Sequence, residues 1–267
     1  MRVGLLGAGK MAEAIASALI QTGLCEPWDI TACDKFEERR NFMAKQYQII
    51  TTNCPVETVN DSEVLVLAVK PQDLDMLLEV IKPYLTANKL IISIVAGKSL
   101  SHIKKLSGKA SRMIRVMPNL ALMVQEGMSV YCASKQATKK DKECVTKIFG
   151  SAGAVISLPE RHFDAVTALS GSGPAFIAYV LDAMIEGARA LKLPKEAARL
   201  LAEQTLIGAG IYLQNSGRDI GEFIKAVASP KGTTVAGLAV LEKSSLRATI
   251  IKTLKAAAKR SAELSKV

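Results

Sequence analysis

Arg2-Val-Gly-Leu-Leu-Gly-Ala-Gly-Lys-Met-Ala12 is the stretch that decides the fold of this chain of 267 residues. Its apolar beginning predicts a strand over residues 2–6, and the apolar spacing that follows predicts a helix over residues 11–21. Gly7, Gly9 and Ala12 have the spacing of the glycine fingerprint by which a strand–turn–helix unit binds a dinucleotide. Gly7 permits the tight turn, Gly9 leaves room for a pyrophosphate at the helix N-terminus, and Ala12 lets the helix pack on the strand. The chain is therefore predicted to open with a dinucleotide-binding domain.

Strand-like and helix-like segments alternate through the first 158 residues. Further strands are predicted over residues 29–33, 64–69, 90–95, 113–116, 129–131 and 155–157, and helices over residues 35–46, 72–82, 100–106 and 139–149. This alternation predicts right-handed crossovers and a parallel, doubly wound α/β sheet of the Rossmann type in residues 1–158.

Residues 159–267 contain no strand-like run and form a predicted all-α domain. Helical spacing of Ala, Leu, Ile and Gly covers residues 163–169, 175–193, 195–214, 220–228, 233–243 and 245–264. About 110 helical residues are few for a hydrophobic core of their own, and the small residues among them let helices approach closely. We therefore expect a helical dimerisation domain that packs against a second copy of the chain.

The composition is that of an ordinary soluble globular protein, with 49% hydrophobic and 22% charged residues. The net charge of +10 reflects either basic residues on solvated helix faces or a field that favours anionic small ligands such as a phosphorylated cofactor. Only 4% of the residues are aromatic and no long basic block is present, which argues against nucleic-acid binding. The absence of a run of about 18 uncharged apolar residues argues against a membrane span. Five scattered cysteines without a Cys-x-x-Cys pair predict reduced thiols in the cytoplasm, and we expect no metal site.

Asp34 is expected to end the second strand, at the distance of the residue that binds the cofactor ribose. An acid there accepts a hydrogen bond from the 2′-hydroxyl of NAD and repels the 2′-phosphate of NADP. Lys35, Arg39 and Arg40 follow at once, and they either reach such a phosphate or merely decorate a helix. The sequence leaves the choice between the two cofactors open.

The carboxyl ends of the other predicted strands contribute further cofactor contacts, because in open α/β sheets these ends face the ligand crevice. Lys70 is either a structural cation or a cofactor contact, and Asn119 either lies near the reacting ring or caps its turn. The predicted cofactor-binding residues are Gly7, Ala8, Gly9, Lys10, Met11, Asp34, Lys35, Asn53, Ala68, Val69, Lys70, Pro71, Val95, Ala96, Gly97 and Asn119.

Two loops of small residues interrupt the helical part, Ser170-Gly-Ser-Gly-Pro-Ala175 and Ser229-Pro-Lys-Gly-Thr-Thr234. Gly and Ser let a backbone approach a ligand and direct N–H groups at it. Neither loop is needed to build a helical bundle. They predict that the second domain completes an active site.

Together these motifs resemble the pyrroline-5-carboxylate reductases, over nearly the whole chain. The most specific matches are residues 164–175 and 229–237, supported by Leu67-Ala-Val-Lys-Pro-Gln72 and Arg115-Val-Met-Pro-Asn119. The resemblance implies hydride transfer from NADPH, with NADH usable, to the C5 imine carbon of 1-pyrroline-5-carboxylate, giving L-proline in the last step of its biosynthesis. It also implies a homodimer of interlocking helical domains, with a decamer as a further possibility.

The resemblance further implies where the substrate binds. Its carboxylate is expected on the backbone N–H groups of Gly232, Thr233 and Thr234, and the Thr234 hydroxyl, the implied catalytic group, bonds the ring nitrogen. Glu160, Ser172, Gly173 and Ser229 complete the implied substrate site. A protonated iminium already accepts hydride well, so positioning supplies most of the rate enhancement. His102 and His162, the only histidines, are not expected to be catalytic.

The chain departs from the family pattern at several positions. Lys231 and Gln125 replace glycines, Leu120-Ala121 replaces Thr-Pro, and Ala228 replaces Ser or Thr. If Lys231 adopts a positive φ, the lysine costs about 1 kcal/mol or more; alternatively its ammonium attracts the substrate carboxylate.

Two other functions fit parts of the sequence. One is a related imine or hydroxyacid reductase, although a hydroxyacid dehydrogenase needs a lysine within residues 175–193, where only Lys192 stands, at the far end. The other is an NAD(P)-binding sensor without turnover.

Overall fold

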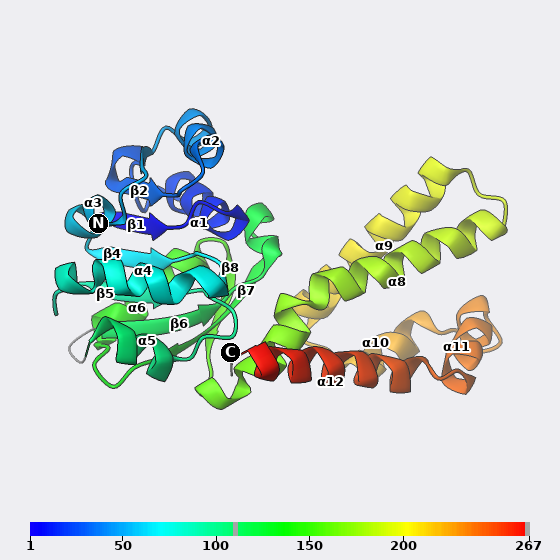
Figure 1. The fold of residues 1–267 in the computed structure, drawn as a ribbon. Helices are drawn as coiled ribbons and strands as arrows, with labels where there is room; N and C mark the ends of the chain where they lie inside the picture. The colour runs from blue at the N-terminus through cyan, green and yellow to red at the C-terminus, as the bar shows by residue number, and fades with distance from the viewer. Residues whose placement is uncertain (109–111, 265–267) are drawn as a thin grey trace. The chain divides into compact units, whose positions relative to one another are not determined.

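One eight-stranded sheet forms the centre of the N-terminal part of the chain in the computed structural model, which describes residues 1–108 and 112–264 (Figure 1). Its strands are β1 (Val3–Leu6), β2 (Ile30–Cys33), β3 (Ile50–Thr52), β4 (Val64–Leu67), β5 (Leu90–Ser93), β6 (Arg112–Met117), β7 (Gly127–Ala133) and β8 (Gly153–Ser157). Their spatial order is β3-β2-β1-β4-β5-β6-β7-β8. Strands β1 to β6 have the order expected of a doubly wound dinucleotide-binding sheet.

Strands β1 to β6 are parallel, as predicted, whereas β7 runs antiparallel to β6 and parallel to β8. The direction of β7 follows from its connection. Residues 118–126 contain only the short 3-10 helix η4 (Leu120–Val124), which is too short for a crossover that would return the chain to the starting edge. The helix between β7 and β8 restores a parallel pair.

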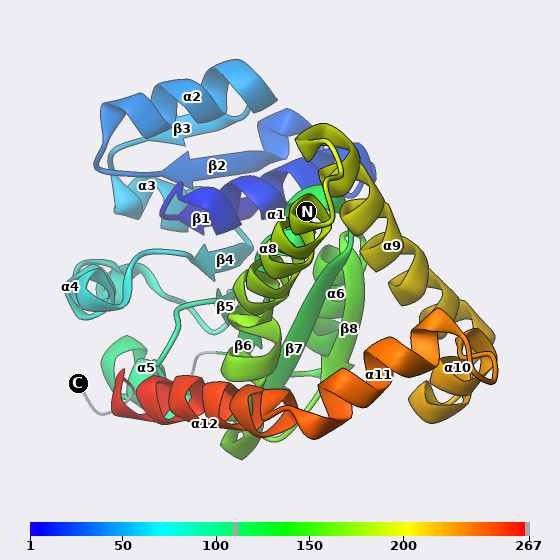
Figure 2. The same ribbon diagram turned by 90° about the vertical axis from the view of Figure 1, so that its right-hand side faces the viewer.

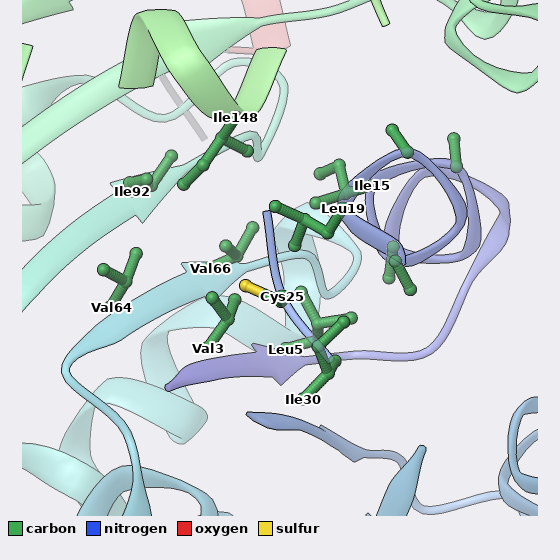
Figure 3. Close-up of a cluster of buried hydrophobic side chains, with 14 of the residues drawn as sticks. Val3, Leu5, Ile15, Leu19, Cys25, Ile30, Val64, Val66, Ile92 and Ile148 are labelled. Carbon is green, nitrogen blue, oxygen red and sulfur yellow. The ribbon is translucent and has the colours of Figure 1, made fainter. Parts of the chain in front are cut away.

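Helices cover both faces of the sheet. They are α1 (Lys10–Gln21), α2 (Glu37–Tyr47), α3 (Pro55–Asp61), α4 (Leu74–Ile81), α5 (Leu100–Ser107) and α6 (Lys139–Gly150), with short 3-10 turns η1 (Pro27–Asp29), η2 (Pro71–Asp73) and η3 (Lys82–Tyr84). Alternate strand side chains point to opposite faces, so one set of buried apolar residues packs on α1 and α6 and the other on α3, α4 and α5. Figure 3 shows the first cluster, where Leu5 and Val66 of the sheet meet Ile15 and Leu19 of α1.

After β8 the chain is helical throughout the described residues. It continues through η5 (Glu160–His162), α7 (Phe163–Val166), a π-helical turn η6 (Thr167–Gly171), α8 (Gly173–Ala190), α9 (Lys195–Ser216), α10 (Ile220–Val227), α11 (Thr233–Lys243) and α12 (Leu246–Leu264). Helices α8 and α9 lie side by side, and Figure 2 shows α10 and α11 following α9 in chain order. The predicted all-α segment is confirmed.

Contacts divide the chain into two compact units. The first comprises residues 1–172 together with the end of α12 from Lys255, and the second comprises Gly173–Leu254. The division therefore lies beyond the predicted one after residue 158. The reason is that Phe163 and Val166 are buried against Val130 and Cys132 of β7, which keeps α7 with the sheet.

Two elements were missing from the sequence prediction, β3 and α3. The strand is three residues long at the sheet edge and its Ile50 is exposed, so it lacks the apolar run of a buried strand. The helix has seven residues and begins at Pro55, which leaves too few turns for a recognisable period.

Candidate active site

The predicted cofactor residues follow the carboxyl ends of β1 to β6. Leu6 pairs with Cys33 of β2 and with Leu67 of β4, so Gly7, Asp34 and Ala68 leave the sheet side by side. The strand order reverses at this point, between β1 and β4, where open α/β sheets form their ligand crevice.

Gly7 makes the turn that the fingerprint requires. Its φ is +107°, and a Cβ there would lie 2.7 Å from the carbonyl carbon of Ala68 and 2.8 Å from the nitrogen of Val69. Any larger residue would therefore push the loop away from β4. Ala12, which is fully buried, lets α1 pack against the sheet as predicted.

The start of α1 fits an anionic group. The helix is capped by Gly9, which offers no side chain to the first-turn N–H groups, and a Cβ built on Gly9 would meet nothing within 4 Å. The starts of α5 and α6 differ, because Ser99 and Thr138 bond the first-turn N–H groups there. Open N–H groups at a helix N-terminus, beside open space, suit a pyrophosphate.

Asp34 lies at the end of β2 and is fixed by two backbone donors. Its Oδ2 accepts a hydrogen bond from the N–H of Ala8 at 2.8 Å, and its Oδ1 accepts one from the N–H of Phe36 at 2.9 Å. Asn53 follows β3 next to Asp34, because the N–H of Asp34 donates to the carbonyl of Thr52. The carboxylate is thereby held against the glycine loop.

The three basic residues after Asp34 all have protein partners. Arg39 Nε donates to the carbonyl of Ala8 at 2.8 Å, and its Nη2 lies 2.9 Å from the Glu13 carboxylate. Arg40 donates to the carbonyls of Asp34 and Lys35. Lys35 is exposed, and its ammonium lies 3.4 Å from Asp73.

Glu13 is the residue of this region that sequence reasoning missed. It is 4% exposed, and it accepts hydrogen bonds from Arg39, Lys10 and the Tyr47 hydroxyl. Burial acts to raise the pKa of Glu13, but the hydrogen bonds and the positive charges of Arg39 and Lys10 together outweigh it and hold the pKa below its usual value. Its position one residue after Ala12, on a face otherwise made of apolar residues, was the available signal.

The ends of β4 and β5 supply loops of small residues. Lys70 is exposed and precedes η2, while Val95 is buried. Gly97 has a φ of +74°, and a Cβ there would lie 3.3 Å from the carbonyl carbon of Leu264 at the end of α12. The last turn of α12 therefore borders this loop.

Asn119 links the turn after β6 to β7 and to η6. Its Oδ1 accepts a hydrogen bond from the N–H of Met128, and its amide nitrogen lies 3.4 Å from the Ser170 hydroxyl. Its side chain makes no capping hydrogen bond to η4, the turn that it precedes. Ser170 belongs to the π-helical turn η6, a rare form of helix that is frequent at functional sites.

Glu160 is part of a partly buried ion pair. Its Oε1 lies 3.0 Å from the guanidinium of Arg115 and accepts a hydrogen bond from the N–H of Leu100 at 2.8 Å. The Arg115 side chain is 7% exposed and stacks on the Phe163 ring. The pair ties the start of α5 to β6 and η5. Arg115, which the sequence analysis quoted only as part of a motif, is the ion-pair partner of Glu160.

The second loop of small residues lies in the second unit. Lys231 has a φ of +60°, the left-handed conformation, and Gly232 then caps α11 without a side-chain hydrogen bond. A Cβ on Gly232 would collide with the Ser229 hydroxyl. The first N–H groups of α11 are uncapped, and Thr234 stands half-buried in its first turn. Gly173 begins α8, directly after Ser172, the last residue of the first segment of the other unit.

The histidines differ in their surroundings. His102 Nε2 lies 2.7 Å from a carboxylate oxygen of Asp75, and the His102 side chain is partly exposed. His162 ends the 3-10 turn η5 and is exposed.

Comparison with known proteins identifies the family. Residues 160–264 match the family described as pyrroline-5-carboxylate reductase dimerisation, and residues 2–97 match NADP oxidoreductase, coenzyme F420-dependent. A pyrroline-5-carboxylate reductase of Arabidopsis thaliana is 39% identical over 264 residues, covering 99% of this chain and 95% of the plant protein. The chain belongs to the pyrroline-5-carboxylate reductase family.

Solved structures of pyrroline-5-carboxylate reductases share the whole fold. The one from Coxiella burnetii is 35% identical and has a TM-score of 0.93, covering 100% of this chain and 99% of its own. A pyrroline carboxylate reductase of Plasmodium falciparum, solved with NADP bound, is 28% identical with a TM-score of 0.90, covering 99% and 98%.

Proposed function

We propose that this chain reduces the C5=N bond of 1-pyrroline-5-carboxylate with NAD(P)H to give L-proline, the last step of proline biosynthesis. The observation that carries the proposal is the Ser229–Thr234 loop, which precedes α11 and leaves the first N–H groups of this helix uncapped. Helix α1, which follows the glycine fingerprint, also begins without a side-chain cap. Each helix start can bind an anion, a pyrophosphate at α1 and a carboxylate at α11. Full-length similarity to pyrroline-5-carboxylate reductases supports this assignment.

The cofactor, when bound, supplies a hydride from C4 of its nicotinamide. The fit of the fingerprint supports Gly7, Ala8, Gly9, Lys10 and Met11 as the residues that hold its pyrophosphate. The NADP bound by the relative from Plasmodium falciparum supports a nicotinamide dinucleotide here. Asp34, Lys35 and Asn53 would hold the adenosine ribose, and the loops after β4, β5 and β6 would hold the remainder.

On the substrate side, the backbone N–H groups of Gly232, Thr233 and Thr234 would bind the carboxylate. The Thr234 hydroxyl is available for the ring nitrogen, because no other described residue bonds it. Its role is to orient the ring and to stabilise the protonated imine by hydrogen bonding. Ser229, Ser172 and Gly173 remain proposed substrate contacts. Glu160 is proposed there by resemblance, and its bonds to Arg115 and Leu100 favour a supporting role instead.

The helical region associates with another copy of the chain, as its dimerisation family describes. Large apolar side chains of the second unit are exposed in the single chain, among them Tyr179 at 79%, Leu200 at 67% and Val240 at 69%. The continuous helical segment Glu160–Ala190 is long and apolar enough to cross a membrane by length and composition, and 6% of its most apolar window is buried. A helical dimer interface accounts for the same exposure. We propose a homodimer, with assembly to a decamer as its extension, and no membrane or nucleic-acid partner.

A cytoplasmic location is proposed from the thiols. The five cysteines are unpaired, and burial raises the pKa of Cys33 to about 11 and that of Cys132 to about 12. Such thiols stay protonated and are poor partners for disulfide exchange.

The test is oxidation of NADH and of NADPH by the purified protein with 1-pyrroline-5-carboxylate, followed by the loss of absorbance of the reduced nicotinamide. Appearance of L-proline in step with that loss supports the proposal. Binding of a dinucleotide without reduction of the imine refutes it and favours the sensor, and turnover only with unrelated imines favours another imine reductase.

A further inference from the structure

The ribose end of the cofactor site carries a fixed negative charge. Both oxygens of Asp34 accept backbone hydrogen bonds, from Ala8 and from Phe36, at 2.8 and 2.9 Å. One bond to each oxygen holds the carboxylate beside the glycine loop. Each oxygen retains a further lone pair, so Asp34 can still accept a hydrogen bond from a ribose hydroxyl.

The nearest arginines are directed elsewhere. The Arg39 guanidinium binds the carbonyl of Ala8 through Nε and Glu13 through Nη2, and it lies 4.8 Å from the centre of the Phe42 ring. Arg40 is bonded to two successive carbonyls, those of Asp34 and Lys35. In Arg39 the Nε–Nη2 edge, by which an arginine binds a phosphate in a bidentate way, is thus occupied within the protein, and Arg40 is held to the backbone by Nη1.

Glu13 is the group that holds Arg39 in this position. Its carboxylate is 5% exposed, against 27% for the Arg39 side chain, so the ion pair is anchored from within the protein. Lys10 and Tyr47 bond the same carboxylate, which fixes its position. A carboxylate buried among these donors keeps its charge, and therefore its hold on Arg39, at neutral pH.

Lys35 is the remaining cation next to Asp34. It is exposed, its ammonium lies 3.4 Å from Asp73, and it is 5.3 Å from the centre of the Phe36 ring. Asp73 brings a second carboxylate close to the ribose end, which offsets the charge of Lys35.

We propose that this ribose pocket selects the dinucleotide with a free 2′-hydroxyl, NADH, over NADPH, and that Glu13 maintains the selection by withholding Arg39 from a 2′-phosphate. The inference rests on the dinucleotide-binding part of the proposed function, which accommodates either cofactor. Asp34 is the residue that contacts the ribose, and Glu13 is a positioning residue.

The decisive measurement is equilibrium binding to the full-length protein, independent of turnover. Dissociation constants are measured for NADH and NADPH by the change in nicotinamide fluorescence, and for 5′-AMP and 2′,5′-ADP by calorimetry. Repulsion between a phosphate and a fixed carboxylate leads us to expect about tenfold tighter binding of NADH, with 5′-AMP preferred over 2′,5′-ADP in the same sense. Tighter binding of NADPH overturns the inference and leaves the reductase function intact. Tighter binding of NADH without reduction of the imine supports the inference but refutes the reductase function. Failure to bind either dinucleotide refutes the inference and the reductase function together.

Variants separate the two residues. Asp34→Ser is expected to shift the ratio of the two dissociation constants at least about tenfold towards NADPH. Glu13→Gln is expected to raise the affinity for NADPH relative to NADH about fivefold, and Arg39→Gln added to it is expected to remove that gain. Glu79→Gln, which removes an exposed carboxylate from α4, is the matched control and should leave the ratio unchanged.

A merely structural role for Glu13 predicts a different result, in which Glu13→Gln weakens both dinucleotides alike. That outcome overturns the assignment of Glu13. If Glu13→Gln does not fold, Arg39→Gln alone still tests the idea. A withheld guanidinium predicts less than about a twofold change in NADPH affinity, whereas a larger loss shows that Arg39 already binds the phosphate.

Discussion

Replacing Lys231 by glycine should stabilise the folded protein. Lys231 is exposed and has a φ of +60°, between Pro230 and the glycine that caps α11. A side chain with a Cβ is strained in this conformation, whereas glycine is not. The family pattern places a glycine here, and the structure shows why.

The expected gain is the difference between two opposing contributions. Relief of the left-handed strain is worth about 1–2 kcal/mol, and the extra freedom of glycine in the unfolded chain takes back about 0.5–1 kcal/mol. The net gain in the free energy of unfolding is therefore about 0.5–1 kcal/mol. In a protein of this size that is a rise in Tm of roughly 2–3 °C.

The assay is a thermal melt of both proteins at equal concentration, because association makes Tm depend on protein concentration. Lys252→Gly, at an exposed position within α12, is the matched control and should lower Tm, since glycine costs about 1 kcal/mol inside a helix. A lower Tm for Lys231→Gly would refute the argument from strain.

The same variant tests the charge of Lys231. If its ammonium attracts the substrate carboxylate, the KM for 1-pyrroline-5-carboxylate rises about two- to fivefold in Lys231→Gly while kcat is kept, and the difference shrinks at high salt. An unchanged KM assigns Lys231 no part in substrate attraction. Opposite effects on Tm and KM would show that the strain persists because the charge is useful.

Three further predictions concern Thr234, Glu160 and Glu13. Thr234→Ala should lower kcat/KM for the imine about 100-fold by removing the hydrogen bond to the ring nitrogen, and wild-type rates would contradict the role of Thr234. Glu160→Gln should lower the free energy of unfolding by about 2 kcal/mol, because it leaves the buried Arg115 unpaired; a Tm within error of the wild type would show that the pair is dispensable. The folded-state pKa of Glu13 lies below its unfolded value, so its stabilising contribution is full above the unfolded pKa and is lost as the pH falls through the folded pKa. The Tm difference between wild type and Glu13→Gln should therefore stay constant above about pH 5 and shrink as the pH falls below about 4.5, and a difference that grows there would reverse the sign of this argument.

Local patterns made most of the fold predictable. The fingerprint around Gly7 identifies the first strand–turn–helix unit from adjacent residues alone. The apolar runs of β1, β4 and β5 likewise identify buried strands, and the predicted cofactor loops follow the carboxyl ends of these strands. The direction of β7 was not visible in its own residues. It depends on the length of the connection before it, and that length was available in the sequence.

Contacts between residues far apart in the chain could not be predicted from the sequence. Whether Arg39 reaches a phosphate depends on Glu13, which lies 26 positions earlier and is brought to it by the packing of α1 and α2. Glu160 was assigned by resemblance alone, and its bond to Arg115 spans 45 positions. From the sequence, Lys231 was expected to be strained only if its φ is positive. Its φ of +60° shows that it is.

The end of α12 has a consequence for how the protein is made. Residues from Lys255 belong to the same compact unit as β1, and Leu264 borders the loop at Gly97, while Ser261 donates a hydrogen bond to Asp164. A ribosome therefore completes the sheet early, then synthesises most of the dimerisation segment, and only afterwards releases the turns that pack beside the loop at Gly97 in the first unit. The nascent chain carries an unfinished nucleotide-binding fold through most of the second half of its synthesis.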